Sequence, residues 1–483
     1  MRSRTSVEPW RRVAGVEVEY GYATGQTNSV LFTGQPPRYI DCGHSNCWWP
    51  NGSRRYNDIS GPEAATAECT DPWQMMHLVE ANHQLMRAAL YREGDPVPPF
   101  LAAPVADLFA NNGYLDDWLH RRGTHLNFQL SRTTNVAQLH RFITAFLVTN
   151  IIVFGSGQFP YLNLNEPFRL SPRARSIEDI MSGATTRARP LINTRLEHHA
   201  FDSLRLHVTS TPNTHILPRM VAVEMAAYLG ILAYFDTGRS QEGLPEFMYP
   251  IRALHTIDAH PDRPQLMKSG QPMTALDVQR WYFDRVWSLI DSTGAEADRL
   301  RPWVLEWGRY LDRLAVTFDP EYHFGMLDWA TKQCFWRRWL SEHPRPLGVS
   351  WEDPWFKAYH TLDLDLHRIT RSDDRPSRRD LLIKRFGGLD GDLVEWFKLN
   401  PPQNTRARVR AWLLEVCHPG SEVGITSLDW GKCSFKRHPC PPSSMLALSN
   451  TVTMPLPLNP NPPAQMLVNV VSRFPGARVL DKI

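Results

Sequence analysis

A short alternating segment near the start of the chain, Gly15-Val-Glu-Val-Glu-Tyr-Gly21, most constrains what the chain can fold into. Side chains at positions i and i+2 of a strand lie on the same face, so Glu17 and Glu19 share one face and the valines share the other. Neighbouring carboxylates repel each other unless a cation compensates them, and Mg²⁺ prefers oxygen ligands. The pattern predicts a metal-binding strand over an apolar core, although an edge strand with two surface acids fits the same pattern.

A second group of acids follows another candidate strand. Asp58 ends the segment Asn51-Gly-Ser-Arg-Arg-Tyr-Asn-Asp58, and Glu63 and Glu68 follow within ten residues. Carboxylates that gather behind two strands indicate a site for a cation, for proton transfer, or for both.

Polar rows are expected on two later strands. Alternation in Gly123-Thr-His-Leu-Asn-Phe-Gln-Leu130 gives His125 and Asn127 one face and the apolar residues the other. In Leu204-Arg-Leu-His-Val208, Arg205 and His207 share a face in the same way. A polar row on a strand with an apolar back is typical of the wall of a site and also of an exposed strand face.

Two arginine-rich segments favour an anionic ligand, because guanidinium forks match phosphate oxygens. Arginines in solvated surface segments are the alternative. The first segment, residues 185–195, carries three arginines, and the second opens a helix, where cations oppose the helix dipole. These arginines are Arg187, Arg189, Arg195, Arg406, Arg408 and Arg410.

The rest of the chain reads mainly as helical scaffold. Residues 245–272 are expected to be rich in loops, and residues 455–463 are rich in proline. The helices predicted from the 3.6-residue period cover residues 71–91, 137–153, 218–237, 274–292, 301–316 and 327–340.

Composition bounds the class of protein. The chain has 483 residues, of which 42% are hydrophobic and 21% charged, as expected for a globular protein with one large and one smaller domain. A net charge of +3 does not by itself decide about nucleic acid. The most apolar stretch, residues 142–154, is interrupted by polar residues and is predicted to be a buried helix. We expect a cytoplasmic protein with neither nucleic-acid nor membrane partners, and no secretory signal in residues 1–12.

The seven cysteines lack the spacing of a disulfide framework. Cys42 and Cys47 are one candidate half of a zinc site, with Cys433, His438 and Cys440 as the other half. Neither half has the tight Cys-x-x-Cys spacing, so free thiols in a reducing compartment are the preferred interpretation.

Taken in order, these segments resemble the family of Pup ligases and depupylases, which is itself similar to glutamine synthetase and other carboxylate–amine ligases. Each motif is short, but the set keeps its order over residues 13 to about 430. The motifs include Gly15-Val-Glu-Val-Glu-Tyr-Gly21, Asn51-Gly-Ser-Arg-Arg-Tyr-Asn-Asp58, Pro62-Glu-Ala-Ala-Thr-Ala-Glu-Cys69, Gly123-Thr-His-Leu-Asn-Phe128, Thr185-Thr-Arg-Ala-Arg-Pro-Leu-Ile-Asn-Thr-Arg195, Arg205-Leu-His-Val208, Pro401-Pro-Gln-Asn-Thr-Arg-Ala-Arg408 and Asp429-Trp430.

The resemblance implies an α+β fold. A large glutamine-synthetase-like domain over residues 13–400 would pack a curved antiparallel sheet against helices and cradle ATP and Mg²⁺. A small C-terminal domain over residues 401–483 would follow it, and residues 1–12 would form a flexible tail. The implied reaction is ATP-dependent amide or isopeptide formation, in which a carboxylate is phosphorylated and an amine attacks the acyl phosphate.

Carried over position by position, the resemblance assigns Asp58 as the catalytic residue that helps to deprotonate the amine. That role is needed because a free lysine has a pKa of about 10.4, and a nearby carboxylate can accept its proton. Metal ions and arginines would stabilise the transferring phosphoryl group. The implied metal ligands are Glu17, Glu19, Glu63 and His199, and the implied ATP-binding residues are Tyr56, His125, Asn127, Arg187, Arg195, Arg205 and Arg410.

Several positions depart from the family pattern. The usual His-Pro-Glu-Tyr is Gly61-Pro-Glu-Ala64 here, and the usual His-Glu-Asn is His125-Leu-Asn127. Further differences follow Arg195 and lie at Thr211-Pro-Asn213. We interpret this drift as retained activation chemistry with a changed substrate, so an amino-acid or peptide carboxylate with an amine is preferred over a Pup-like protein tail and a target lysine.

Two other functions remain as alternatives. A depupylase or deamidase on the same scaffold would carry an insertion of several dozen residues, for which the segment between Glu19 and Asp58 leaves no room. A catalytically inactive relative with a binding role is disfavoured because the clustered acids are retained.

Overall fold

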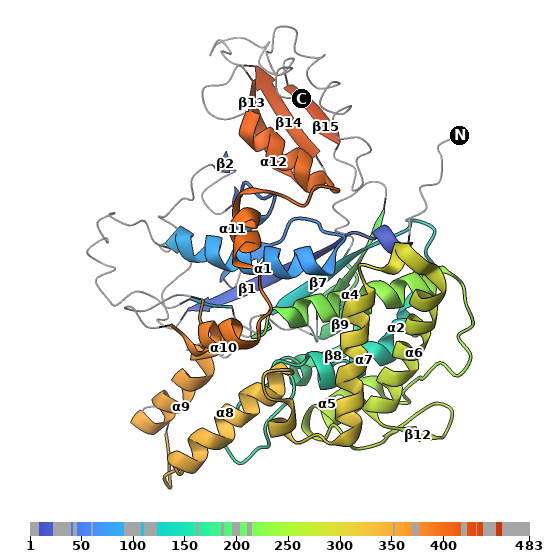
Figure 1. Ribbon diagram of the computed structural model, residues 1–483, viewed down its shortest axis with the longest axis vertical. Helices are drawn as coiled ribbons and strands as arrows, with labels where there is room; N and C mark the ends of the chain where they lie inside the picture. The colour runs from blue at the N-terminus through green and yellow to red at the C-terminus, as the bar shows by residue number, and fades with distance from the viewer. Residues whose placement is uncertain are drawn as a thin grey trace.

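The computed structural model has the α+β fold that the sequence predicts. Figure 1 shows a large sheet with helices packed beside it and a small sheet at one end of the molecule. The structure describes residues 9–22, 40–41, 46–58, 61–90, 108–110, 123–160, 164–184, 188–195, 203–209, 215–350, 353–369, 376–416, 423–430, 432–437 and 451–455. Most of the expected tail, residues 1–8, lies outside these ranges, and Pro9–Arg11 forms the short 3-10 helix η1.

The large sheet has ten strands in the order β2-β3-β4-β5-β1-β7-β10-β9-β8, with β6 paired to β1. Its pairs are antiparallel except for β8 with β9. The strands are β1 (Ala14–Tyr22), β2 (Ile40–Asp41), β3 (Asn46–Trp48), β4 (Arg54–Asp58), β5 (Gly61–Ala65), β6 (Leu108–Ala110), β7 (Thr124–Leu130), β8 (Ile177–Ser182), β9 (Arg189–Asn193) and β10 (Leu204–Val208).

Helices supply most of the remaining described structure. They are α1 (Pro72–Leu90), α2 (Val136–Thr149), α3 (Ile151–Phe154), α4 (Arg219–Asp236), α5 (Pro250–Ala259), α6 (Ala275–Thr293), α7 (Arg301–Val316), α8 (Asp328–Glu342), α9 (Pro354–Asp365), α10 (Arg378–Phe386), α11 (Gly391–Leu399) and α12 (Arg406–Val416). Short 3-10 helices are η3 (Ala174–Ser176), η4 (Gly294–Ala297) and η5 (Pro320–His323), and β11 (Gln265–Leu266) pairs with β12 (Pro272–Met273).

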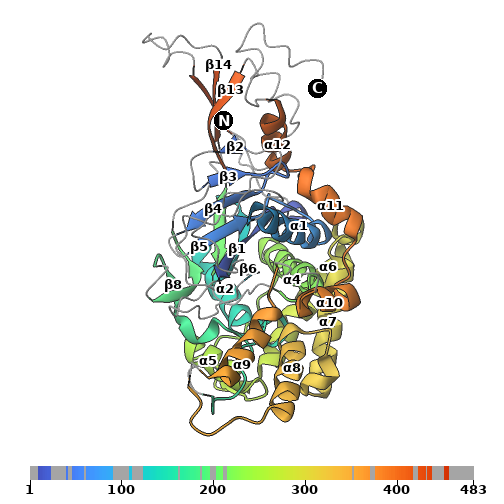
Figure 2. The same cartoon turned by 90° about the vertical axis from the view of Figure 1, so that its left-hand side faces the viewer.

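Strand β1 is a central strand of this sheet, since it pairs with β5 on one side and β7 on the other. The edge-strand alternative for the Glu17 segment is therefore wrong. Val16 and Val18 are buried in the main core with Leu126 and Phe128 of β7. Figure 2 shows that α1 and α4 lie beside one face of the sheet, so the alternation of β1 leaves its glutamates on the opposite face.

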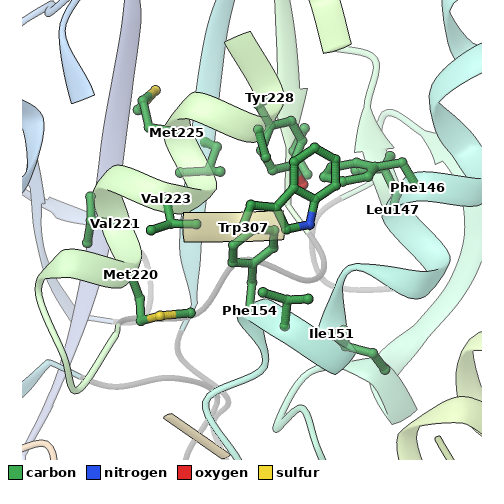
Figure 3. Close-up of a cluster of buried hydrophobic side chains, with 14 of the residues drawn as sticks. Phe146, Leu147, Ile151, Phe154, Met220, Val221, Val223, Met225, Tyr228 and Trp307 are labelled. Atoms are coloured by element: carbon green, nitrogen blue, oxygen red, sulfur yellow. The ribbon is translucent and has the colours of Figure 1, made fainter. Parts of the chain in front are cut away.

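The helical core forms where α2, α3, α4 and α7 meet (Figure 3). Phe146 of α2 contacts Tyr228 of α4 and Trp307 of α7 with ring centroids 5.0 and 6.0 Å apart. The stretch Val136–Phe154 is long and apolar enough to cross a membrane, but 72% of its most apolar window is buried inside the protein. This is the buried helix that the polar interruptions predict, divided at Asn150 into α2 and α3.

Residues after the link at 400–405 form a C-terminal unit of α12 and a small sheet. The division into two domains near residue 400 remains a prediction. The sheet has the order β13-β14-β15, with β13 at Val423–Asp429, β14 at Lys432–Arg437 and β15 at Thr451–Pro455. In Figures 1 and 2 the unit lies at the end of the molecule that also holds β2 and β3.

The region 245–272 is rich in loops, as expected, and also contains a helix that was not predicted. This helix, α5, begins at Pro250 and buries Ala253, Leu254 and Ile257. Its ten residues span few helical turns, and the interior position Asp258 is a buried acid. These features weaken the apolar period on which the prediction depended.

Candidate active site

A carboxylate and two imidazoles from three adjacent strands meet on the open face of the large sheet. Glu17 of β1 pairs in register with His125 of β7, and His207 of β10 pairs with Asn127 of the same strand. Glu17 Oε2 lies 3.3 Å from His125 Nδ1 and 3.6 Å from His207 Nε2. The candidate ligand atoms of these residues all lie within 4.8 Å of one another, so they surround a common point.

Further acids lie beside this cluster. Glu19 Oε1 is 3.7 Å from His125 Nε2, and Glu19 Oε2 accepts a 2.6 Å hydrogen bond from the backbone N–H of Gly123. Glu63 of β5 is the register partner of Glu19 and of Tyr56 in β4, and the Tyr56 hydroxyl donates to Glu63. Three predicted carboxylates and Tyr56 are thus on adjacent strands.

Electrostatics keep Glu17 ionised. Burial alone would raise its pKa, but the hydrogen bond from His125 and the charges of His207 and Arg205 hold the pKa well below its usual value. Burial, followed by the charge of Glu63, raises the pKa of the Tyr56 phenol. Tyr56 therefore remains a neutral donor to Glu63.

Arg205 and Asn127 extend the polar face beyond the cluster. Arg205 Nη1 donates to Asn127 Oδ1 over 3.3 Å and lies 3.9 Å from Glu17 Oε1. Strand register fixes the position of Arg205, because Arg205 of β10 is paired with Gln129 of β7.

A cavity with about 570 Å³ of space, part of it open to solvent, lies between this sheet face and the C-terminal unit. Glu17, Asn127 and Arg205 line it from the sheet, and Arg406 and Trp430 line it from the C-terminal unit. Glu17 therefore belongs both to the three-residue cluster and to the cavity wall.

The residues fit a divalent cation and a polar ligand. Carboxylate oxygens suit Mg²⁺, and neutral imidazoles are ligands of many divalent metals. Gly15 and Ala65 supply apolar parts of the cavity wall, and the charged lining combines Arg205 and Arg406 with Glu17 and Glu68.

Arg410 lies away from the three-residue cluster. It is fully buried in α12, and its guanidinium binds Glu68, with Nη1 3.0 Å from Glu68 Oε1. Arg406 Nε donates to the same oxygen over 2.5 Å. Burial alone would raise the pKa of Glu68, but the charges and hydrogen bonds of Arg410 and Arg406 lower it to about 2. The anion that the arginines at the start of α12 require is therefore Glu68.

The other predicted residues are less well placed or lie outside the description. Asp58 is the last residue of β4, opposite Gly61 in register and two positions beyond Tyr56; its side chain is outside the described part. Arg187 and His199 also lie outside the described residues. Arg195 is exposed, and its Nε donates to the Gly183 carbonyl over 3.0 Å.

Two residues of the candidate site, His207 and Trp430, were not predicted to bind a ligand, and Arg406 was predicted only as one of a series of arginines that favour an anion. His207 was placed on the same strand face as Arg205, but only the β10–β7 pairing brings it to Glu17. Arg406 and Trp430 reach the cavity from the far end of the chain. Their sequence signals were the arginine series in α12 and the Asp-Trp pair.

Two departures from the family pattern do not face this site. Ala64 and Leu126 are buried in the core, on the helix-covered side of the sheet. Position 126 lies between His125 and Asn127, so alternation places it on the opposite face from them. These two differences are changes in the core, and they remove part of the support for a changed substrate.

The described cysteines form no zinc cluster. Cys47 and Cys433 are buried, and neither takes part in a disulfide among the described residues. Cys42, His438 and Cys440 lie outside the described ranges. Within those ranges, the group of three that could hold a metal is the one formed by Glu17, His125 and His207.

Comparisons with known proteins found relatives along most of the chain. The family model described as Pup-ligase protein matches residues 26–434. A Pup–protein ligase 1 of Rhodococcus erythropolis is 31% identical over 437 residues, covering 87% of this chain and 92% of the relative. A Pup–protein ligase of Bifidobacterium longum (strain NCC 2705) is 29% identical over 452 residues, covering 87% of each chain.

Solved structures share the fold. The crystal structure of the complex between the prokaryotic ubiquitin-like protein Pup and its ligase PafA matches with a TM-score of 0.73 and 22% identity, covering 98% of this chain and 94% of that one. The structure of the Pup ligase PafA in complex with ADP matches with a TM-score of 0.70 and 23% identity, covering 89% and 90%.

Proposed function

Because the chain belongs to the Pup-ligase family and is an ATP-dependent amide-bond-forming ligase, we propose that it joins the carboxylate of a Pup-like protein to a lysine of a target protein. The observation that carries the proposal is the position of Glu17, which belongs both to a cluster that fits a metal ion and to the wall of a cavity. This arrangement suits a nucleotide whose phosphates extend toward a bound cation.

Each group of residues in the candidate site would have its own role in binding. Glu17, His125 and His207 would hold one cation, and Glu19 and Glu63 would offer further oxygen ligands beside it, with the Tyr56 hydroxyl donating to Glu63. When bound, Mg²⁺ neutralises phosphate charge and orients the γ-phosphoryl group. Arg205 would bind phosphate oxygens from the sheet, and Arg406 and Trp430 would enclose the nucleotide from the C-terminal unit.

The chemistry would proceed in two displacements. An oxygen of the substrate carboxylate attacks the γ-phosphorus, the bond to the β-phosphate oxygen breaks, and ADP leaves. The lysine nitrogen then attacks the carbonyl carbon of the acyl phosphate while Asp58 accepts its proton, and inorganic phosphate leaves. Roles for Arg187, Arg195 and His199 near the phosphates remain part of this proposal.

We now prefer a protein, and not a free amino acid, as the substrate that supplies the carboxylate. The small-substrate hypothesis depended on drift around the site, and Ala64 and Leu126 lie in the core instead. The curated relatives are Pup–protein ligases that the chain covers over 87% and 92% of their lengths. We propose the cytoplasm as the location, since the reaction consumes ATP.

The test is a two-substrate ATPase assay. Purified chain with ATP and Mg²⁺ is incubated with a Pup-like protein and a lysine-bearing protein, together or singly, and ADP and conjugate are measured. Conjugation only when both proteins are present supports the proposal. Amide formation with free amino acids at equal or higher kcat/KM would restore the small-substrate reading.

A further inference from the structure

We infer that Arg410 is a positioning residue that holds Trp430 over the nucleotide cavity without touching the nucleotide. This inference rests on the proposed function, because it takes the cavity at Glu17 and Trp430 as the nucleotide site. It gives Arg410 a different role from the phosphate contact that the sequence resemblance implies.

The Arg410 guanidinium packs beside a pair of indole rings. Its Cζ is 4.9 Å from the ring centroid of Trp48 in β3 and 4.9 Å from that of Trp430. The rings themselves meet edge to face, with centroids 4.7 Å apart. Arg410 Nη1 also approaches the Trp430 carbonyl oxygen at 3.4 Å. Both the backbone and the ring of Trp430 are therefore fixed by the guanidinium.

Both terminal nitrogens of Arg410 already have acceptors. Nη1 and Nη2 each donate to an oxygen of Glu68, and Nη2 also donates to the Gly52 carbonyl over 3.1 Å. The side chain has no exposed surface, whereas Arg406, one turn earlier in α12, lines the cavity. Arg410 thus acts behind the cavity wall.

The contacts around Arg410 also join the C-terminal unit to the large sheet. Trp48 Nε1 donates to the Leu428 carbonyl over 3.2 Å, and Arg54 Nη1 lies 3.5 Å from Asp429 Oδ1. Gly52 has a positive φ of 77°, and a Cβ there would meet the Ala407 carbonyl oxygen at 3.0 Å. The turn between β3 and β4, which contains Gly52, is therefore in close contact with α12. A change at Arg410 would displace the part of the C-terminal unit that carries Trp430.

Lysine cannot replace this arginine. A planar fork binds both oxygens of Glu68 while it packs beside the two rings, and an ammonium group cannot form that fork. Arg410→Lys keeps the positive charge but releases Trp430. A stacked aromatic ring contributes strongly to the binding of a base, so nucleotide affinity is the property expected to change.

The experiment compares Arg410→Lys with Arg379→Lys in the full-length chain. Arg379 is a matched control, because it is also buried and its Nη2 lies 2.7 Å from Glu80 Oε2, between α10 and α1. For each variant KM for ATP, kcat and the Kd of ADP by calorimetry are measured, both alone and in a Trp430→Ala background.

Arg410→Lys is expected to raise KM for ATP and the Kd of ADP about tenfold, with kcat at saturating ATP within about twofold and no further change in the Trp430→Ala background. Arg379→Lys is expected to leave KM and Kd unchanged. Equal effects of the two lysine variants, or an undiminished effect of Arg410→Lys without Trp430, would overturn the inference.

A second variant covers the case in which Arg410→Lys does not fold. Trp48→Phe removes the hydrogen bond to Leu428 and alters the ring behind Arg410, and the same rise in KM without loss of kcat is expected. An unchanged KM would contradict the inference. If Trp430→Ala leaves ADP affinity unchanged, the nucleotide cavity itself is misassigned, and the proposed function fails at that step.

Discussion

Glu17 and His207 lie on strands separated by β7, yet His207 Nε2 is 3.6 Å from Glu17 Oε2. This contact depends on antiparallel pairing of β7 with both neighbours, which aligns His125 with Glu17 and Asn127 with His207. The sheet therefore brings together three side chains that are far apart in the sequence and that could hold a metal ion.

Removing one ligand tests the cluster. His207→Gln is expected to raise the divalent-cation concentration for half-maximal activity about tenfold or more, because one of three donors is lost. The measurement is activity against Mg²⁺ and Mn²⁺ concentration, with EDTA treatment abolishing activity in the wild type. His140→Gln, on α2, is the control and should behave as wild type; equal shifts in both variants would contradict the assignment.

Asp58→Asn tests the proton acceptor. We expect amide formation to fall by about 10² to 10⁴-fold, the usual contribution of a general base. The Kd of ADP should stay close to the wild-type value, since the amine and not the nucleotide needs this carboxylate. Quenched-flow conjugation and calorimetry measure the two properties. Parallel loss of both would identify Asp58 as a structural or nucleotide-binding residue.

Substitutions at two adjacent residues of β7, Leu126 and Asn127, distinguish an effect on the core from an effect on the candidate site. Leu126→Ala is expected to lower the free energy of unfolding by about 2–5 kcal/mol, because Leu126 is buried behind the sheet. It should leave the KM values of both substrates unchanged. Asn127→Ala should do the reverse, raising KM for ATP with little loss of stability. A shift in acid-substrate preference in Leu126→Ala would revive the changed-substrate hypothesis.

A pH-dependent contribution to stability is expected from His215. Burial lowers its pKa, but hydrogen bonds to Asp328 (2.8 Å) and Glu224 (3.0 Å) together raise the pKa to about 9 from 6.5. A raised pKa means that the folded state binds the proton more tightly, so the stabilisation is complete below pH 6.5 and lost as pH rises to 9.

Thermal unfolding between pH 6 and 10 measures this effect. The midpoint of the wild type is expected to fall between pH 6.5 and 9, and His215→Gln should lower the midpoint at pH 6 and flatten the decline. A decline of the same steepness in the variant would show that other groups cause it.

Local sequence patterns predicted the strands and side chains of the candidate site better than the contacts between them. Alternation in β1 and β7 identified Glu17, Glu19, His125 and Asn127, because a strand with an apolar back has only one polar face. His207 was on the expected face of its strand, but its approach to Glu17 is a consequence of strand order. A single sequence does not determine strand order from periodicity.

Long-range packing also explains the interpretations that changed. The arginine series in α12 correctly signalled an anion, but the nearest one is Glu68 of the same chain. The substitutions at Ala64 and Leu126 were interpreted as changes around the substrate, yet both side chains pack toward the helices. Distinguishing a partner inside the chain from a ligand requires the tertiary structure.

The central claim is that ATP activates a carboxylate as an acyl phosphate. Its most direct test uses a Pup-like protein whose reacting carboxylate carries ¹⁸O at both oxygens. This protein is incubated with the enzyme, ATP, Mg²⁺ and a lysine-bearing protein. The account predicts that one ¹⁸O atom from each activated carboxylate appears in the released inorganic phosphate, in step with conjugate formation. Conjugate formed with phosphate that contains no ¹⁸O would contradict it.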